Sequence, residues 1–273
     1  MAVTEADVHE ARQRAWDVFT RRRTVPVVDG ATILASAPVR GLSNDAGIRQ
    51  AITTPLADGL LDARWRPDVV MAGQHGDALW TAHTGTISGL FVGELWGVPP
   101  SGRHAELRYG EFTRVLDGEV VELRVLADLP GLAAGAGWHL FPDAAPAGAG
   151  WSGRPAAELD PSRRVCDGID TELTRTLFDR LRDGVHHDDL FAPTARRWSC
   201  HGLDQVPEEE LAVGSDVRIV DGEFAASCSW PTDGGTPSMM FFVRDGDRFV
   251  ASWTLVDLIH RAATRGDDLL ARS

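Results

Sequence analysis

The sequence predicts an α+β protein that consists of two similar units in tandem. Each half of the 273-residue chain begins with a helical pattern and continues with several strand-like runs. A segment with a turn, a strand and an Asp-Leu ending occurs at Asp128-Leu129 and again, 129 positions later, at Asp257-Leu258. A stretch rich in Ala, Gly and Pro separates the two halves. A tandem duplication accounts for all three observations.

Two helices are expected in the first unit. Residues 4–23 place Val8, Ala11 and Ala15 at helical spacing, and Thr4 offers an N-cap with Asp7 three residues later. A second helical stretch begins at Asn44 or Asp45 and runs to residue 61.

The strands of the first unit are separated by Gly, Asp and Pro signals. Leu116-Asp117-Gly118 lies between two strand-like runs and predicts a hairpin, because Gly supplies the positive φ that such a turn requires. The last two strands should therefore pair antiparallel. The predicted strands cover residues 25–39, 68–72, 78–90, 104–115 and 119–127.

The change in composition between residues 129 and 161 marks the predicted domain boundary. We expect a first unit over residues 1–140, a linker over 141–165 and a shortened second unit over 166–273. The second unit repeats the order of the first and ends in an amphipathic helix. Its predicted helix covers residues 168–185, and its strands cover 196–200, 216–220, 224–230, 239–243 and 248–255.

Composition and charge exclude several functions. A net charge of −13 repels nucleic acid and anionic membranes, so neither is an expected partner. Every basic residue other than His is Arg, and the absence of Lys excludes Schiff-base chemistry, a pyridoxal phosphate anchor and the phosphate-binding loop that ends in Lys. The N-terminal segment is charged and no apolar run is long enough to span a membrane, so we expect a soluble, cytoplasmic protein.

Cysteines and histidines indicate no metal site. Cys166, Cys200 and Cys228 are widely spaced and form no Cys-x-x-Cys pair, so buried free thiols are expected. The run at residues 186–189 (His-His-Asp-Asp) places neighbouring side chains on diverging faces, which disfavours joint ligation. The prediction is a site without metal or cofactor.

The first unit contains three segments that together resemble a known family. They are His83-Thr84-Gly85-Thr86, the loop Trp96-Gly97-Val98-Pro99-Pro100-Ser101-Gly102-Arg103, and the stretch from Arg114 through Asp117-Gly118 and Glu122 to Asp128-Leu129. This pattern resembles the SnoaL-like polyketide cyclase family across residues 83–132. The resemblance is weaker in the second unit, where the Pro-Pro loop is shortened.

The resemblance implies the fold and the reaction. The fold would be that of nuclear transport factor 2: two tandem cone-shaped α+β barrel units, each with a curved antiparallel sheet packed on helices. The reaction would be a cofactor-free, aldol-type cyclisation, or a related isomerase, hydrolase or dehydratase reaction, on a polyketide-like or other carbonyl-bearing molecule of secondary metabolism.

The same resemblance makes Asp128 the catalytic general base, with Asp257 as its counterpart in the second unit. A carboxylate in an apolar pocket gains basicity because desolvation raises its pKa. The alternative for both residues is a helix N-cap, since each Asp stands at a strand end before a helical pattern.

Strand alternation adds three candidates to the site. Tyr109 and Glu111 share one face of their strand, and Thr81 and His83 share one face of the preceding strand. His83 and Glu111 are candidate catalytic groups and Tyr109 a substrate contact. Glu111 as a solvated ion-pair partner of an arginine, and His83 as a structural hydrogen-bond donor, remain open.

The remaining candidate substrate contacts are aromatic or charged. Indole rings offer a planar, apolar ligand a large contact area, although they pack equally well in a core. These candidates are Trp80, Trp96, Arg108, Trp253 and Asp257.

Departures from the family pattern leave a second function open. Arg124 stands where the family has an aromatic residue, and Ala251 stands where it has an acid. The alternative is therefore a non-catalytic small-molecule-binding or scaffold protein with a degenerate pocket. In either case we expect the two units to form a pseudo-dimer within the chain, while association of whole chains into a homodimer stays open.

Overall fold

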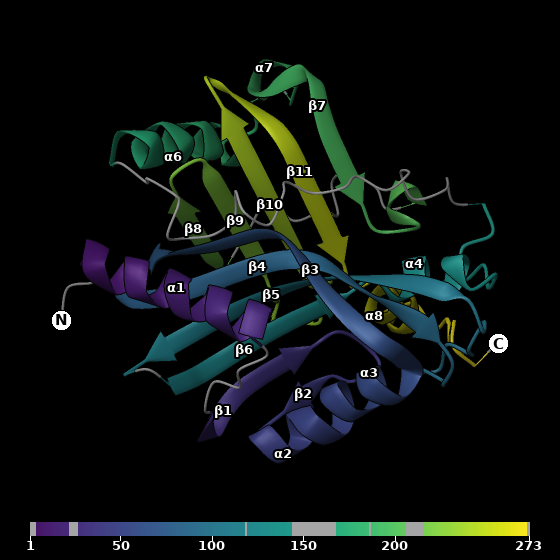
Figure 1. The fold of residues 1–273 in the computed structure, drawn as a ribbon. Helices are drawn as coiled ribbons and strands as arrows, with labels where there is room; N and C mark the ends of the chain where they lie inside the picture. Colours follow the sequence, from purple (N-terminus) through teal and green to yellow (C-terminus); the bar gives the residue numbers. More distant parts are fainter. Residues whose placement is uncertain are drawn as a thin grey trace.

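The computed structural model describes residues 4–21, 27–117, 119–143, 168–185, 187–205 and 216–271. In these residues the chain forms two sheets with flanking helices (Figure 1). The first half contains α1 (Glu5–Arg21), β1 (Val27–Ala35), β2 (Gly41–Leu42), α2 (Asp45–Ile48), the π-helical segment η1 (Arg49–Thr53), α3 (Thr54–Gly59), β3 (Leu60–His75), β4 (Ala78–Phe91), β5 (His104–Leu116), β6 (Glu119–Ala127) and α4 (Leu129–Gly135). The second half contains α6 (Gly168–Arg182), α7 (His187–Leu190), β7 (Phe191–Ser199), the short 3₁₀ helix η2 (Leu203–Gln205), β8 (Val217–Asp221), β9 (Phe224–Ser229), β10 (Ser238–Asp245), β11 (Arg248–Val256) and α8 (Leu258–Thr264).

Each half of the chain builds its own sheet. The strand order is β2-β1-β6-β5-β4-β3 in the first sheet and β7-β11-β10-β9-β8 in the second. In both, a last hairpin of antiparallel strands is followed by a short helix. The predicted α+β class with two tandem units is confirmed. None of the described helices is long and apolar enough to cross a membrane.

The sheets are mixed, which corrects the expectation of purely antiparallel sheets. β1 pairs parallel to β6, and β7 pairs parallel to β11. The physical reason is the connection: parallel neighbours need a long crossover, and β1 reaches β6 only after the helices and the three long strands have intervened.

The helix starts follow their predicted caps. The backbone N–H of Asp7 donates to Thr4 Oγ1 at 3.3 Å, and that of Thr4 donates to Asp7 Oδ2 at 2.8 Å, which is a capping box. Asn44 Oδ1 accepts from the N–H of Gly47 at 2.8 Å and begins the second helical stretch. That stretch passes through a π-helical turn and ends at Gly59.

The largest error of the strand prediction concerns β3. This strand covers 16 residues, whereas a strand over residues 68–72 was expected. The strand was missed because residues 61–66 are mostly exposed and carry no alternating apolar pattern. The pairing of β3 with β4 also shifts register between Pro67 and Val69, which marks a bulge. Proline at a bulge of an edge strand costs no sheet hydrogen bond, so the strand continues through it.

Some predictions concern residues outside the described part of the chain. These are Gly118 in the hairpin, most of the linker (144–165), Cys166 and His186, and the side chains of His187 and Asp188 are not described either. Cys200 and Cys228 are buried free thiols, as predicted.

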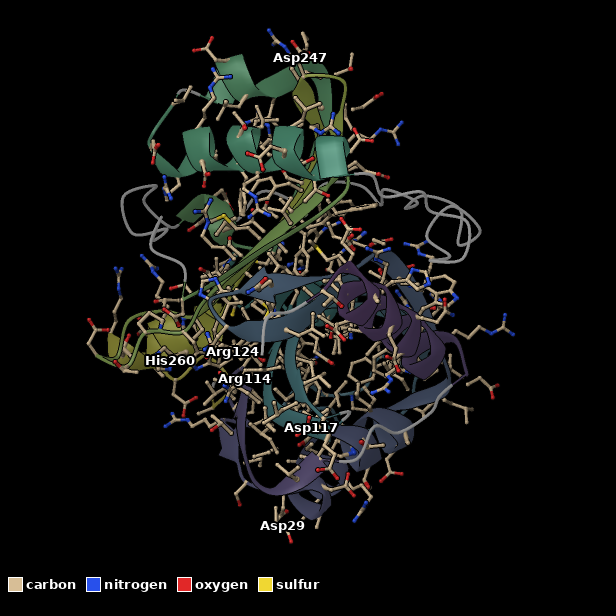
Figure 2. The ribbon with its side chains drawn as sticks, turned by 90° about the vertical axis from the view of Figure 1, so that its left-hand side faces the viewer. Asp29, Arg114, Asp117, Arg124, Asp247 and His260 are labelled. Carbon is tan, nitrogen blue, oxygen red and sulfur yellow. The ribbon has the colours of Figure 1, made fainter. Side chains whose placement is uncertain are left out.

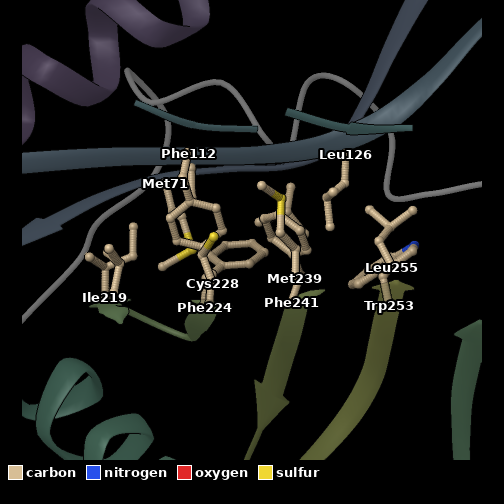
Figure 3. Close-up of a cluster of buried hydrophobic side chains, with 14 of the residues drawn as sticks. Met71, Phe112, Leu126, Ile219, Phe224, Cys228, Met239, Phe241, Trp253 and Leu255 are labelled. Atoms are coloured by element: carbon tan, nitrogen blue, oxygen red, sulfur yellow. The ribbon is translucent and has the colours of Figure 1, made fainter. Parts of the chain in front are cut away.

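The two sheets pack against each other face to face. Phe112 and Leu126 point from the first sheet toward Phe241 and Trp253 of the second, and these side chains are almost completely buried. Figure 3 shows the side chains of both sheets meeting in one layer. Strand alternation turns every second residue to this shared face, so burial of apolar area between the units holds them together.

A buried ion pair adds a polar link between the halves. Arg12 of α1 pairs with both carboxylate oxygens of Asp221, at the end of β8. Asp221 Oδ2 also accepts from the backbone N–H of Ala72 in β3 at 3.0 Å. The carboxylate thus has charged and neutral donors, which offset the cost of burying it.

At Gly110 side chains of the second sheet pack directly onto the backbone of β5. A Cβ at this position would lie 2.8 Å from Leu255 Cδ1 and 3.0 Å from Phe241 Cε2. The absence of a side chain in the middle of β5 therefore allows the second sheet to approach.

We expect Gly110→Ala to lower the free energy of unfolding by about 1–3 kcal/mol, because overpacking strains a close-packed interface. Urea unfolding followed by circular dichroism measures the change. Gly135→Ala is the matched control, since nothing lies within 4 Å of a Cβ there and no positive φ is recorded. Equal stability of both variants would contradict this description of the interface.

Candidate functional site

A histidine and a glutamate form a pair on the face of the first sheet that points away from the second unit. His83 in β4 and Glu111 in β5 are cross-strand partners, and His83 Nε2 lies 3.2 Å from Glu111 Oε1. Thr113 Oγ1 donates to the same carboxylate oxygen at 2.8 Å. Glu111 is therefore held from two sides, by its cross-strand partner and by the next residue on its own face.

Two aromatic side chains extend this pair. Tyr109 lies two positions before Glu111, and its ring centroid is 5.6 Å from that of His83 in an edge-on arrangement. Trp65 of β3 meets Tyr109 edge-on at 5.3 Å. We call His83, Glu111, Tyr109, Thr113 and Trp65 the polar cluster of the first unit.

Gly85 explains the spacing of the His-x-Gly motif. A Cβ at Gly85 would lie 2.9 Å from Pro67 Cα and even closer to the carbonyl oxygen of Arg66. The backbone of β3 lies close to β4 here, next to the register shift between Pro67 and Val69. Trp65, two residues before Pro67, contacts Tyr109. His83 faces the cluster two residues earlier on the same strand face.

Burial and charge act in opposite directions on Glu111. Burial raises the pKa of Glu111, but the electrostatic interaction with His83 and the hydrogen bonds from His83 and Thr113 outweigh it, so the pKa lies below its ordinary value. The carboxylate is therefore ionised at neutral pH.

The phenol of Tyr109 is kept neutral by its surroundings. Burial, and then the negative charges of Glu111 and Asp68, raise the pKa of Tyr109 well above its ordinary value. A neutral phenol beside a carboxylate and an imidazole is a hydrogen-bond donor at neutral pH.

The polar cluster is partly open to solvent. His83 and Tyr109 are buried, whereas 28% of the Glu111 side chain and 40% of Trp65 are exposed. The solvent-facing part of the cluster is therefore the ionised acid and the indole, and the imidazole and the phenol lie buried beside them.

Asp128 lies outside this cluster. Its carboxylate caps α4, where Oδ1 accepts from the N–H of Gly131 at 2.9 Å. Oδ2 accepts from the N–H of His201 in the second unit at 3.4 Å. Burial raises the pKa of Asp128 to about 6, while these hydrogen bonds and Arg108 act in the other direction. The structure thus shows the capping arrangement that the sequence left as the alternative.

Asp257 and Arg108 also lie between the units. Asp257 caps α8, and burial raises its pKa. The guanidinium of Arg108 donates to Asp68 at 2.9 Å and stacks 4.6 Å from the ring centroid of Trp198 in the second unit. Both residues were predicted to contact substrate, but their observed partners are protein groups at the unit boundary.

The three predicted tryptophans pack against protein as well. Trp80 and Trp253 are buried in the layer between the sheets, where Arg124 lies 5.5 Å from the ring centroid of Trp80. Figure 2 labels Arg124 near the level where the sheets meet. Trp96 packs at the edge of another cluster and donates from Nε1 to the carbonyl of Ala51 at 2.8 Å.

Sequence reasoning missed two members of the polar cluster, Trp65 and Thr113. Trp65 was missed because the mostly exposed residues 61–66 carry no alternating apolar pattern, so a strand was expected only from residue 68. Thr113 continues the alternation of Tyr109 and Glu111 and was within reach of the same argument.

Among the described residues, no group of three His, Cys, Asp or Glu side chains could hold a metal ion. Burial raises the pKa of both Cys200 and Cys228, in the latter case to about 12. Thiols of this kind are poor ligands and nucleophiles at neutral pH.

The second unit has none of the cluster's ionisable groups at the matching positions. Val125 and Thr254 are matching positions, because each lies three residues before the Asp that caps the following helix. Val125 pairs with Glu111 and Thr254 pairs with Met240, so Met240 occupies the position of Glu111. The next strand pairs His83 with Glu111 and Ser227 with Met240, so Ser227 occupies the position of His83. The same registers align Tyr109 with Ser238.

Phenylalanines fill the corresponding face of the second unit. Phe178 of α6 contacts Phe242 with 5.4 Å between ring centroids, and Phe249 contacts Phe242 at 5.1 Å. This face is a hydrophobic core where the first unit has a polar cluster.

Comparison with known proteins gives likeness of structure only. No protein-family model and no curated protein matches the sequence. IdmH from Streptomyces antibioticus, described as a candidate polyketide cyclase, is 21% identical with a TM-score of 0.38, and the match covers 47% of this chain and 98% of that chain. AclR from Streptomyces galilaeus, described as a candidate hydroxylase, is 19% identical with a TM-score of 0.35 over 45% of this chain and 80% of that chain.

An NTF2-like protein from Burkholderia thailandensis is 16% identical with a TM-score of 0.37, and the match covers 47% of this chain and 96% of that chain. A further matched structure, from Jannaschia sp. CCS1, is described as a candidate SnoaL-like polyketide cyclase and is 20% identical with a TM-score of 0.33 over 44% of this chain and 78% of that chain. Each matches less than half of this chain, which is the length of one unit.

We expect Thr113→Val to raise the pKa of Glu111, because the variant loses a hydrogen bond to the carboxylate and keeps its burial. Carbon-13 NMR titration of the Glu111 carboxyl group measures it. Thr81→Val is the matched control, since Thr81 lies opposite Thr113 and donates no hydrogen bond to Glu111 within the described chain. An unchanged pKa in Thr113→Val would contradict the assigned contact.

We expect Asp128 to make the protein less stable as the pH rises from 4 to 6. A carboxyl whose pKa is higher in the folded than in the unfolded state binds more protons when folded, so its contribution falls between the two pKa values. Here these values are about 6 and 3.8, which corresponds to about 3 kcal/mol. Urea unfolding at several pH values measures the free energy of unfolding of the native protein and of Asp128→Asn. The difference between the two proteins isolates Asp128, because Asp257 is present in both and its contribution cancels. A constant difference across this range would disprove the prediction.

Proposed function

We propose that the first unit is a cofactor-independent acid/base enzyme that acts on a carbonyl-bearing, polyketide-like small molecule. The observation that carries this proposal is the His83–Glu111 pair beside the buried phenol of Tyr109, partly open to solvent. Of the reaction types implied by the SnoaL-like resemblance, aldol-type cyclisation, isomerisation and dehydration use proton transfer next to a carbonyl group, whereas hydrolysis uses a base to activate water. A setting in cytoplasmic secondary metabolism belongs to the same proposal.

His83 serves as the proton-transferring group in this proposal. Glu111 is ionised and its pKa is lowered, so it is a weak base, but it stabilises the imidazolium that forms when His83 accepts a proton. The imidazole takes a proton from the carbon next to the carbonyl, and the electron pair of the broken C–H bond moves onto the carbonyl oxygen. The imidazolium returns the proton to the product.

Tyr109 stabilises the negative charge that develops on the substrate oxygen. Its phenol is neutral and donates a hydrogen bond to that oxygen, which a preorganised donor does with little rearrangement. Trp65 offers its exposed indole to an apolar part of the substrate.

The second unit supplies no chemistry in this proposal. Met240 and Ser227 cannot form an acid/base pair, and phenylalanines occupy the surrounding face. Its role is that of a built-in partner that covers the back of the first sheet.

Binding without turnover is the second candidate function. It is favoured by the edge-on Trp65–Tyr109 pair, which contacts a ligand in the same way whether or not a proton is transferred. The same experiment separates the two functions.

The test measures hydrogen–deuterium exchange at carbon in D₂O. A panel of aromatic and aliphatic ketones, esters and β-ketoesters is incubated with the protein, and proton NMR follows exchange next to the carbonyl group. We expect exchange above the buffer rate for at least one compound. His83→Gln and Glu111→Gln should reduce the rate by about 10²-fold or more.

Ser227→Ala and Met240→Leu, at the matching positions of the second unit, are the control variants and should leave the rate unchanged. Ligand binding without exchange would favour the binding protein. Loss of exchange in Asp128→Asn, with Glu111→Gln fully active, would return the role of base to Asp128 and contradict the proposed pair.

A further inference from the structure

Asp128 in the first unit and Asp257 in the second make equivalent contacts, and each reaches from its own unit to the other. With one oxygen, Asp128 caps its own helix, and with the other it accepts from the N–H of His201 in the second unit. Asp257 accepts from the N–H of His260 at 2.9 Å and from the N–H of Ala37 in the first unit at 2.8 Å. Each carboxylate therefore has one partner in its own unit and one in the other.

The donors in the two units are matching positions. Ala37 lies two residues after β1, and His201 lies two residues after β7. β1 and β7 are the parallel neighbours of the last strands β6 and β11 in their sheets. The backbone angles agree as well, with φ and ψ of −80° and 73° at Asp128 and of −75° and 77° at Asp257.

Both short helices depend on tertiary contacts. α4 and α8 have seven residues each, too few for a helix to be stable alone. Leu129 and Leu132 of α4 share one apolar cluster with Ile259 of α8, so the helices meet across the unit boundary. A carboxylate that caps a helix and also binds the other unit sets the position of the helix start.

We propose that Asp128 and Asp257 are a reciprocal pair of latches that fasten the C-terminal helix of each unit to the other unit. At these positions the chain uses the strand-end aspartate for assembly of the two units. The Asp257 latch is a short hydrogen bond of 2.8 Å from the backbone N–H of Ala37, and the Asp128 latch is a longer contact of 3.4 Å from the backbone N–H of His201. Each is lost when the second carboxylate oxygen is removed.

Serine separates the latch from the cap. Ser is as good an N-cap as Asp, but its single short hydroxyl cannot also reach the other unit. Asp128→Ser and Asp257→Ser therefore remove one latch each and keep both helices capped.

Amide hydrogen exchange read by NMR at single residues tests the proposal. We expect Asp128→Ser to speed exchange of the His201 amide about tenfold or more and to leave the Ala37 amide unchanged. Asp257→Ser should do the reverse. Each variant thus serves as the control for the other, and no substrate is needed, so the outcome is independent of the proposed function.

Asp128→Asn is the second variant in case Asp128→Ser fails to fold. Asn also caps helices, but one of its two terminal atoms is a donor, so exchange at His201 should again rise and exchange at Ala37 should not. Equal acceleration at both amides, or no acceleration at either, would overturn the proposal.

Discussion

The face-to-face contact of the two sheets is the constraint on which the rest of the structure depends. Phe112, Leu126, Phe241 and Trp253 are buried in this one layer. Because side chains alternate along a strand, using one face of β4, β5 and β6 for this contact leaves only the other face for a ligand. The contact therefore determines which residues of the first sheet are available for chemistry. His83, Tyr109 and Glu111 lie on the available face, and Arg108, Asp128 and Trp80 do not.

The two units keep the same contact and differ on their other faces. In the first unit this face carries an ionised acid, an imidazole and a phenol. In the second it carries a cluster of phenylalanines under α6, and the matching positions hold Ser227, Ser238 and Met240. A filled apolar face stabilises a unit, whereas buried polar groups cost stability and are kept where they serve a purpose. The difference is the physical argument for the proposal that the first unit carries the chemistry and the second unit supports it.

Much of the fold was predictable because its signals are local. The hairpin at Asp117, the caps at Thr4 and Asn44 and the repeated Asp-Leu ending each depend on neighbouring residues. The parallel pairing of β1 with β6 and the length of β3 were not predicted, because pairing partners distant in sequence and exposed edge residues leave no periodic pattern. In the site, alternation correctly grouped His83, Tyr109 and Glu111. Alternation could not show that Arg108 and Trp253 face the other unit, since a pattern of period two distinguishes the faces of a strand but not what covers them.

The central claim is that each chain has a single site, in the first unit. Isothermal titration calorimetry tests it most directly, with the compound from the carbonyl panel that exchanges fastest. The account predicts that one molecule binds per chain and that Trp65→Ala abolishes this binding. Trp230 is a partly buried tryptophan of the second unit, and Trp230→Ala is the control that should leave binding unchanged. Two molecules bound per chain, or binding that survives Trp65→Ala unchanged, would contradict it.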